Sequence, residues 1–329
     1  MRKVKRLSPT SLNIFETDRE LFYTKYLSDA KPEWEPQSPA MAVGSSFDAF
    51  VKCALHQHLF GNDGDGEYDL RSLFEKQVNN EEIREWAWRA GKYAFDCYRT
   101  WGCYDDLLKE LEQSEEDPRF EFELHGEIEG VPVVGKPDMW YKRNVQVVLD
   151  WKVMGFCSKH SQSPKKFYKS CRDCWGSDRA KPTRGGGDPK PHKNYEEIEH
   201  YGHKIGKHFL EDVDKKWADQ IALYSWLLGV EIGDEDMVTC IDQLACKPSP
   251  DEESREPLIR VAQHRCRISK EWQEKLLARL TNCWETLQSG HIFDDMSREE
   301  SDARCEVLDM EQPEGDEFWT MVNERQYRG

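Results

Sequence analysis

Residues 131–153 read VPVVGKPDMWYKRNVQVVLDWKV and predict two consecutive β-strands, at 131–140 and 145–153. Both runs are rich in the β-branched and aromatic residues that strands favour. The second run is apolar at almost every position between Val145 and Leu149, which is typical of a strand covered on both faces. We therefore expect this strand near the centre of a sheet.

The neighbouring sequence extends the two strands into an α/β domain. Phe120, Phe122 and Leu124 alternate with charged or polar residues, which indicates a strand with one solvated face. The three strands are expected to follow one another as a meander. Apolar runs and helical periodicity predict further strands and helices, the strands at 237–245 and 258–263 and the helices at 8–27, 40–59, 81–101, 217–230 and 269–288.

These patterns divide the chain into three predicted parts. Residues 1–117 form an N-terminal helical portion, 118–290 an α/β core with a long polar insertion at 155–214, and 291–329 a C-terminal tail. A polar interval as long as this insertion is usually functional or disordered. The predicted fold class is α/β, with a central mixed sheet flanked by helices.

The charge of the chain is unevenly distributed. It carries 63 Asp and Glu against 46 Lys and Arg, a net charge of −17, and such an acidic excess counts against a phosphate-rich ligand. Between Lys159 and Lys193, however, ten basic residues and three Asp give a local charge of +7, which leaves −24 for the remainder. We therefore expect this segment to attract polyanions.

Composition also narrows the class of protein and its compartment. An aromatic content of 12%, with 12 Trp, argues against a disordered chain. No apolar run reaches the roughly 18 residues that cross a bilayer, and no signal-peptide core follows Met1, so no membrane partner is expected. Eleven Cys, an odd number spread over the chain, do not resemble a disulfide framework, which favours the reducing cytoplasm.

Two carboxylates and a lysine lie near the ends of the predicted central strands. Asp138 follows Gly-Lys-Pro, and Asp150 and Lys152 close the apolar strand; an antiparallel pairing would bring both carboxylates to one pocket. Carboxylate and carbonyl oxygens together with a substrate phosphate suit Mg²⁺. A lysine on the same strand face as Asp150 can hold an attacking water or stabilise developing charge. The alternative is a solvated ion pair at a strand end and an Asp in a turn.

Together with other motifs, these residues resemble a known family. Pro137-Asp138 followed by Asp150-Trp151-Lys152 is similar to the signature of the PD-(D/E)xK nuclease superfamily. Three more matches resemble its RecB-like exonuclease branch, which includes Cas4-type and phage recombination nucleases. They are the opening helix at 8–27, GSSFD at 44–48 in place of GxxxH, and QIALY at 220–224 as QxxxY.

The resemblance implies a restriction-endonuclease-like core and a catalytic metal site. Asp138 and Asp150, with the backbone carbonyl of Trp151, would bind Mg²⁺ or Mn²⁺, and Lys152 would be the catalytic lysine. Asp48 stands where the family has His and would approach a second metal site, since a carboxylate is a hard ligand. The alternative for Asp48 is an ordinary helix or surface residue.

The resemblance also assigns positioning residues. Gln220 and Tyr224 would orient the DNA backbone or the catalytic lysine, and they lie four apart on one helix face. The family sometimes places an acidic metal ligand on the first strand, where Glu121 and Glu123 lie. Alternating Glu is also what any solvated strand face contains, so neither residue is assigned a role.

The polar insertion contains a second candidate metal site. Cys157 and His160 are followed about a dozen residues later by Cys171 and Cys174, which matches the ligand number and pair spacing of structural Zn²⁺. This spacing differs from the iron-sulfur arrangement of Cas4-type relatives. The alternative is that these cysteines are incidental in a chain rich in Cys.

The same insertion interleaves basic and aromatic residues. Such a mixture contacts phosphates and stacks on the bases of a single strand, and the residues concerned are Lys165, Lys166, Lys169, Arg172 and Trp175. We predict that they bind DNA. The alternative is a solvated loop whose charges serve only solubility.

The function expected from the sequence is that of a Mg²⁺-dependent DNA nuclease, more an exonuclease than an endonuclease, in recombination, repair or replication. The alternative is a catalytically inactive DNA-binding or assembly protein that retains the nuclease fold. The sequence contains no GxxxxGK[ST] motif, so ATP-driven unwinding would come from a helicase partner. A recombinase and a single-strand-binding protein are the other partners expected, and the resemblance favours a phage or prokaryotic source.

Overall fold

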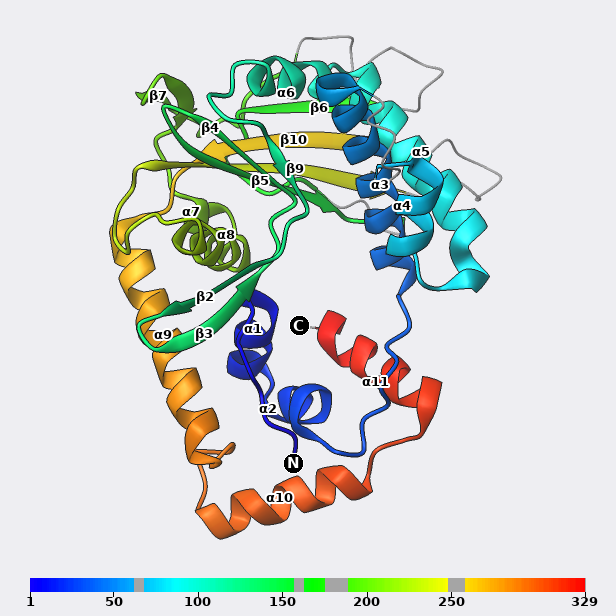
Figure 1. Cartoon of the computed structure of the whole chain (residues 1–329), viewed down its shortest axis with the longest axis vertical. Coiled ribbons are helices and arrows are strands. Elements are labelled where there is room, and N and C mark those ends of the chain that lie inside the picture. The colour runs from blue at the N-terminus through cyan, green and yellow to red at the C-terminus, as the bar shows by residue number, and fades with distance from the viewer. Residues whose placement is uncertain (62–67, 157–162, 175–188, 248–257, 329) are drawn as a thin grey trace.

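The computed structural model describes residues 1–61, 68–156, 163–174, 189–247 and 258–328. Its centre is a six-stranded sheet in the order β1-β4-β5-β9-β10-β6 (Figure 1). The strands are β1 (Arg119–Phe120), β4 (Met139–Arg143), β5 (Val145–Val153), β6 (Ser170–Cys174), β9 (Met237–Lys247) and β10 (Leu258–Cys266). Helices cover both faces, and the predicted fold class, α/β with a mixed sheet and N-terminal helices, is confirmed.

Strand β5 lies inside the sheet, as its apolar sequence predicts. It pairs antiparallel with β4 and parallel with β9, which makes the sheet mixed. Val147, Leu149 and Trp151 face one hydrophobic core and Val148 faces another, because successive strand residues point to opposite faces. Both faces of β5 are therefore buried over most of its length.

One face of the sheet is covered by helices from the N-terminal portion. They are α3 (Pro39–Phe60), α4 (Leu70–Gln77), α5 (Arg84–Thr100) and α6 (Cys103–Leu111), with a short 3₁₀ turn at Glu81–Ile83 (Figure 1). Gly91 of α5 lets the backbone approach α3 closely, since a Cβ there would lie 2.8 Å from the backbone nitrogen of Phe47. This contact fixes the position of α3, which carries Asp48.

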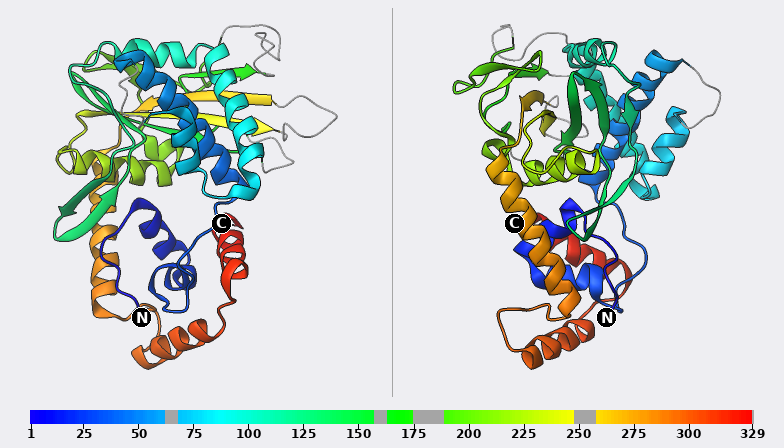
Figure 2. Two further views of the ribbon diagram at one scale, coloured as in Figure 1. Left: turned by 45° about the vertical axis from the view of Figure 1, so that its right-hand side comes forward. Right: turned by 60° about the vertical axis from the view of Figure 1, so that its left-hand side comes forward.

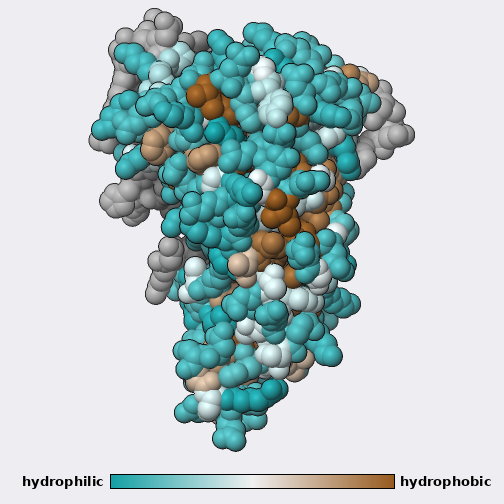
Figure 3. Space-filling view, turned by 90° about the vertical axis from the view of Figure 1, so that its left-hand side faces the viewer, coloured by the Kyte–Doolittle hydropathy of each residue, from teal (hydrophilic) through white to brown (hydrophobic). Residues whose placement is uncertain are grey.

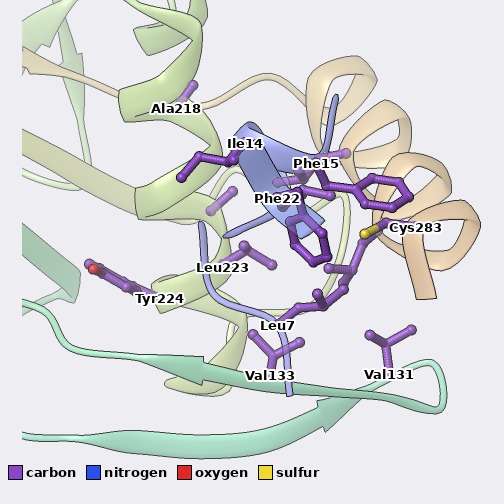
Figure 4. Close-up of a cluster of buried hydrophobic side chains, with 14 of the residues drawn as sticks. Leu7, Ile14, Phe15, Phe22, Val131, Val133, Ala218, Leu223, Tyr224 and Cys283 are labelled. Atoms are coloured by element: carbon purple, nitrogen blue, oxygen red, sulfur yellow. The ribbon is translucent and has the colours of Figure 1, made fainter. Parts of the chain in front are cut away.

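The other face is covered by α8 (Lys215–Leu227), α1 (Pro9–Thr17) and α9 (Lys270–Ser289). Ser8 caps α1 in a capping box with Ser11, and Ser269 caps α9, so hydroxyl side chains satisfy the first free amides of both helices. Figure 4 shows where α1, α8, α9 and β3 meet, with Phe15, Leu223 and Val133 pointing into one cluster.

The predicted meander is wrong. Residues 131–140 do not form one strand: β2 (Leu124–Ile128) and β3 (Val131–Gly135) pair with each other in a separate hairpin, and only β4 joins the main sheet. Lys136 and Pro137 interrupt the run, and Pro has no N–H for a strand ladder. The hairpin instead packs its apolar residues against α1 and α8.

The insertion at 155–214, for which the sequence analysis predicted no strand or helix, contains regular structure in its described parts. β6 forms an edge of the main sheet beside β10, β7 (Glu197–His200) pairs with β8 (His203–Gly206), and a helical turn, α7 (Leu210–Val213), precedes α8. These strands are polar and short. Backbone pairing with an existing sheet edge holds β6, so apolar periodicity could not reveal it.

The residues predicted as a C-terminal tail pack onto the first helices. α10 (Arg298–Met310) and α11 (Gly315–Arg328) curve around α2 (Arg19–Phe22) and the π-helix Tyr23–Leu27 (Figure 2). Tyr23 Oη donates a hydrogen bond to Asp309 at 2.8 Å, and Phe318 and Trp319 are buried in the same core as α1. The two ends of the chain therefore build one layer below the sheet.

The face of the molecule shown in Figure 3 is mostly hydrophilic, with hydrophobic residues in limited patches. Among the helices described, none is both long enough and apolar enough to span a membrane.

Candidate active site

The register of β4 and β5 brings Asp138 to the end of β5. Met139 pairs with Leu149, so Asp138, the residue before β4, lies beside Asp150 and Trp151. Its Oδ2 accepts a hydrogen bond from the backbone N–H of Trp151 at 2.9 Å. The antiparallel pairing that the sequence predicts for these two segments therefore places the two carboxylates at one site.

Lys152 and Gln220 connect β5 to α8. Lys152 Nζ lies 2.7 Å from Gln220 Oε1 and also contacts the Asp150 carboxylate. Gln220 Nε2 in turn lies 3.1 Å from Asp150 Oδ1 and 2.9 Å from Tyr224 Oη. One amide therefore holds both the lysine and the aspartate, while the tyrosine one turn further along α8 orients the amide.

Gly135 makes room for Tyr224. A Cβ at residue 135 would lie 2.7 Å from Cδ1 and 2.9 Å from Cε1 of the Tyr224 ring, closer than real contacts allow. Tyr224 is buried, so its ring cannot swing into solvent to avoid such an atom. The glycine three residues before Asp138 is thus required for the helix carrying Gln220 to pack against β3.

Gly135→Ala is expected to lower the free energy of unfolding by about 1–3 kcal/mol, because overpacking forces buried side chains to shift. The displaced Tyr224 should also loosen the Gln220 hydrogen bonds. Urea unfolding measures the first effect. Gly44→Ala in α3 is the matched control, since open space surrounds that position and Ala favours a helix over Gly. Equal losses of stability in the two variants would contradict the close contact between residue 135 and Tyr224.

Helix α3 contributes a third carboxylate together with a lysine. Asp48 Oδ2 accepts hydrogen bonds from Lys52 Nζ at 2.6 Å and from Gln77 Nε2 at 2.9 Å. Lys52 Nζ also lies 3.5 Å from Glu121 Oε2 and 3.9 Å from Asp138 Oδ1. Asp48 is therefore part of the same site as Asp138, linked to it through the ammonium of Lys52.

Glu121 lies between β1 and β2 rather than within a strand. Its backbone has a positive φ of 44°, and its N–H donates to the carbonyl of Asp138 at 3.0 Å. Its carboxylate contacts Lys136, Lys52 and Gln77. The sequence left Glu121 without a role because its position was interpreted as one of several alternating strand residues.

Sequence reasoning missed Lys52, Gln77 and Lys136. One feature could have revealed Lys52: it lies four residues after Asp48 on a helix, so the two side chains share a face, and its neighbour Val51 is buried. A charged pair inside an apolar helical stripe requires compensation. Gln77 had no such feature, because only the tertiary packing of α4 on α3 brings it to the site.

The carboxylates of the site carry unfavourable negative charge. Burial raises the pKa of Asp150, and the Asp138 carboxylate raises it further. Burial likewise raises the pKa of Asp48, although Lys52 opposes that shift. Despite its own burial, Lys52 has a raised pKa because Asp48, Asp138 and Glu121 surround it. A further cation near Asp138 and Asp150 would relieve this repulsion.

The site opens into a cavity of about 1180 Å³. Asp48, Asp138 and Lys152 line it together with apolar and aromatic residues, which include Tyr68, Phe120, Trp151 and Trp217. A cavity that combines a few polar groups with an apolar lining is typical of a ligand site.

The oxygen donors of the site fit a divalent metal ion. Asp48 Oδ1 is buried and accepts no hydrogen bond from the described residues, and the buried Asp150 Oδ2 faces only the ammonium of Lys152 among them. No three Asp, Glu, His or Cys side chains within those residues are arranged as a metal-binding group. The protein would therefore supply the two carboxylates of Asp138 and Asp150 and a backbone carbonyl, and Mg²⁺, which keeps several waters, accepts such a partial set.

The predicted zinc ligands are only partly covered by the structure. Cys157 and His160 lie outside the described residues. Cys171 and Cys174 lie on β6, opposite Ala262 and Ile259 of β10, and burial raises the pKa of the Cys171 thiol to about 12. The zinc site stays a prediction.

The predicted DNA-binding residues occupy different surroundings. The backbone N–H of Lys165 donates to Gln243 of β9, whose Cα pairs with Lys152, so Lys165 lies near the active-site end of the sheet. Lys166 is exposed. Lys169 Nζ donates to the carbonyl of Lys204, and Trp175 lies outside the described residues.

Arg172 is engaged with α6. Its guanidinium contacts Asp106 at 2.8 Å and the carbonyl of Trp101, and only 16% of its side chain is exposed. These contacts attach the edge strand β6 to the helical layer. The structure therefore gives Arg172 a role in packing. Its role in DNA binding stays a prediction.

No protein-family model matches the chain, and no curated protein matches its sequence. A solved structure that it resembles is described as "Putative exonuclease" from Eubacterium rectale; the two chains are 13% identical, the match covers 87% of this chain and 82% of the other, and the TM-score is 0.40.

Proposed function

We propose that the protein is a Mg²⁺-dependent deoxyribonuclease of the PD-(D/E)xK superfamily, in its RecB-like branch, and that it acts as an exonuclease. One observation carries the proposal: Asp138 and Lys152 line the cavity, Asp150 lies directly beside them, and Gln220 contacts both Asp150 and Lys152. Two carboxylates beside an ordered lysine suit metal-assisted phosphodiester hydrolysis.

Each residue of the site has a distinct task in this proposal. Asp138 and Asp150 hold the ion together with the carbonyl of Trp151, and the Trp151 N–H fixes the orientation of the Asp138 carboxylate. When bound, the ion polarises the scissile phosphate and lowers the pKa of an attacking water. Lys152, held by Gln220, stabilises negative charge that develops on the phosphate, and Tyr224 keeps Gln220 in place.

A divalent-ion assay on two DNA forms tests the proposal. Purified protein is incubated with linear and covalently closed circular duplex of the same sequence, in Mg²⁺ and in EDTA. We expect loss of the linear form alone, and only in Mg²⁺, because an exonuclease needs an end. Binding of DNA without hydrolysis under every condition would favour the alternative, an inactive protein that keeps the fold to bind DNA or assemble with a recombinase, helicase or single-strand-binding protein.

Neutralising Lys165, Lys166 and Lys169 together, as Gln, is expected to weaken DNA binding and flatten its salt dependence. Each phosphate contact contributes about 0.9 to the slope of log affinity against log salt on duplex DNA, so the slope should fall by about 2 to 3. Fluorescence anisotropy at several salt concentrations measures it, in Ca²⁺ so that hydrolysis does not intervene. An unchanged slope would contradict the role assigned to this segment.

A further inference from the structure

Lys52 is the most deeply buried charged side chain of the site. It extends from α3, its side chain is 1% exposed, and its ammonium contacts Asp48, Glu121 and Asp138 at 2.6, 3.5 and 3.9 Å. A buried ammonium needs several charged or polar partners to offset its lost hydration. Here its partners are the carboxylates that surround the metal-binding end of the cavity.

Donor groups fill the space between Asp48 and Glu121. Gln77 Nε2 donates to Oδ2 of Asp48 and Oε2 of Glu121, the same two oxygens that face Lys52. The other Glu121 oxygen contacts Lys136. Positively polarised groups therefore contact three of the four oxygens of these carboxylates, and within the described part of the chain the fourth, Asp48 Oδ1, accepts no hydrogen bond.

The charges of the site also disfavour a second metal ion beside Lys52. Four carboxylates, of Asp48, Glu121, Asp138 and Asp150, face three ammonium groups, of Lys52, Lys136 and Lys152. With all seven groups ionised, the site has a charge of −1 without a metal, and one divalent ion makes it +1. A second divalent ion would give +3 and would have to lie beside the buried ammonium of Lys52, which repels it.

We propose that the Lys52 ammonium takes the place of a second divalent ion, so that this carboxylate site binds a single ion, at Asp138 and Asp150. This inference rests on the proposed function, since it concerns the same metal site. Lys52 is a positioning residue: it holds Asp48, Glu121 and Asp138 in place as a cation supplied by the protein itself.

Counting bound Mn²⁺ without DNA tests the inference. Free Mn²⁺ is followed by electron paramagnetic resonance during titration of the full chain. We expect one bound ion per wild-type chain and two per Lys52→Gln chain, because the variant leaves Asp48 and Glu121 without their buried counter-charge. Lys136→Gln is the matched control: this lysine also contacts Glu121 but is 54% exposed, and one bound ion is expected.

Asp48→Asn is a second variant, which keeps the inference falsifiable if Lys52→Gln fails to fold. We expect it to bind one ion, as the wild type does, because Asp48 serves Lys52 rather than a metal. Two ions per wild-type chain, one ion per folded Lys52→Gln chain, or loss of an ion in Asp48→Asn would each overturn the inference.

The Mn²⁺ count separates this inference from the proposed function. Two ions in a wild-type protein that hydrolyses DNA in Mg²⁺ would overturn the role of Lys52 alone. No bound Mn²⁺ in the wild type would overturn the inference and the metal-dependent function together.

Discussion

Asp150→Asn is expected to abolish Mg²⁺-dependent hydrolysis of DNA while leaving the protein at least as stable as the wild type. The variant exchanges the anionic carboxylate that we propose as a metal ligand for a neutral amide of the same shape, which can still accept the hydrogen bond from Gln220. The expected loss of rate is about 10³-fold, at the upper end of what one preorganised electrostatic group contributes. Initial rates on linear duplex measure it.

The stability of this variant follows from the pKa of Asp150. Burial and the neighbouring Asp138 raise that pKa above its value in the unfolded chain, so the folded state loses stability as the pH rises and the carboxylate ionises. A neutral Asn avoids this cost near pH 7 in the absence of metal. Thermal unfolding in EDTA should give a midpoint equal to or above that of the wild type.

Two further variants serve as comparisons for the activity lost in Asp150→Asn. Asp295→Asn removes an exposed carboxylate far along the sequence from the site and should keep wild-type activity. Lys152→Met should lose activity by about 10²- to 10³-fold through a separate group. Wild-type activity in Asp150→Asn would contradict the assignment of Asp150, and a lowered unfolding midpoint would contradict the stated origin of its pKa.

Asp242→Ala is expected to produce the largest loss of stability, about 3–5 kcal/mol. Asp242 is fully buried in β9 and accepts hydrogen bonds from Arg265 Nη1 at 2.7 Å and from Tyr98 Oη at 2.6 Å. Its removal leaves the guanidinium of Arg265, 7% exposed, without its counter-ion. A buried charge that loses its partner costs far more than an exposed one.

Urea unfolding of two further proteins distinguishes the buried charge from simple loss of packing. Tyr98→Phe removes one hydrogen bond to the carboxylate and should cost about 1.5–3 kcal/mol. The double variant Asp242→Leu with Arg265→Met should recover part of the loss, since apolar residues of similar volume often replace a buried ion pair. A cost below about 1 kcal/mol for Asp242→Ala would contradict the role of this network.

The network matters for the site because Tyr98 also contacts β5. The indole Nε1 of Trp151 lies 3.5 Å from Tyr98 Oη, and the backbone N–H of Trp151 holds Asp138. Helix α5, β9 and β10 are therefore connected to the carboxylate that is proposed to bind metal. Sequence analysis did not identify this connection, since Tyr98 and Asp242 lie 144 residues apart in the chain.

The features that the sequence predicted correctly depend on local patterns. The apolar run of β5 predicted its place inside the sheet, and the spacing of Gln220 and Tyr224 predicted that both lie on one face of α8. The β2–β3 hairpin and the edge strand β6 were missed, because pairing partners distant in the sequence decide whether a strand joins the sheet. Local periodicity carries no information about that choice.

The candidate site was predictable where its residues lie close together in the sequence. Asp138 directly precedes β4, and Asp150 and Lys152 lie on β5, the next strand in the sequence, so their register can be inferred from the hairpin. Lys52 and Gln77 reach the site only because α3 and α4 pack beside it. The role of Gln77 depends on tertiary packing, which no motif in the sequence records, whereas the spacing of Asp48 and Lys52 on one helix face was a local signal that the sequence analysis did not use.

Product analysis on an end-labelled linear duplex tests the central claim most directly. Wild-type protein in Mg²⁺ should shorten the duplex progressively from an end, whereas wild type in EDTA and Lys152→Met in Mg²⁺ should leave it intact over the same time. A duplex that stays intact with the wild type in Mg²⁺, or identical products from wild type and Lys152→Met, would contradict the account.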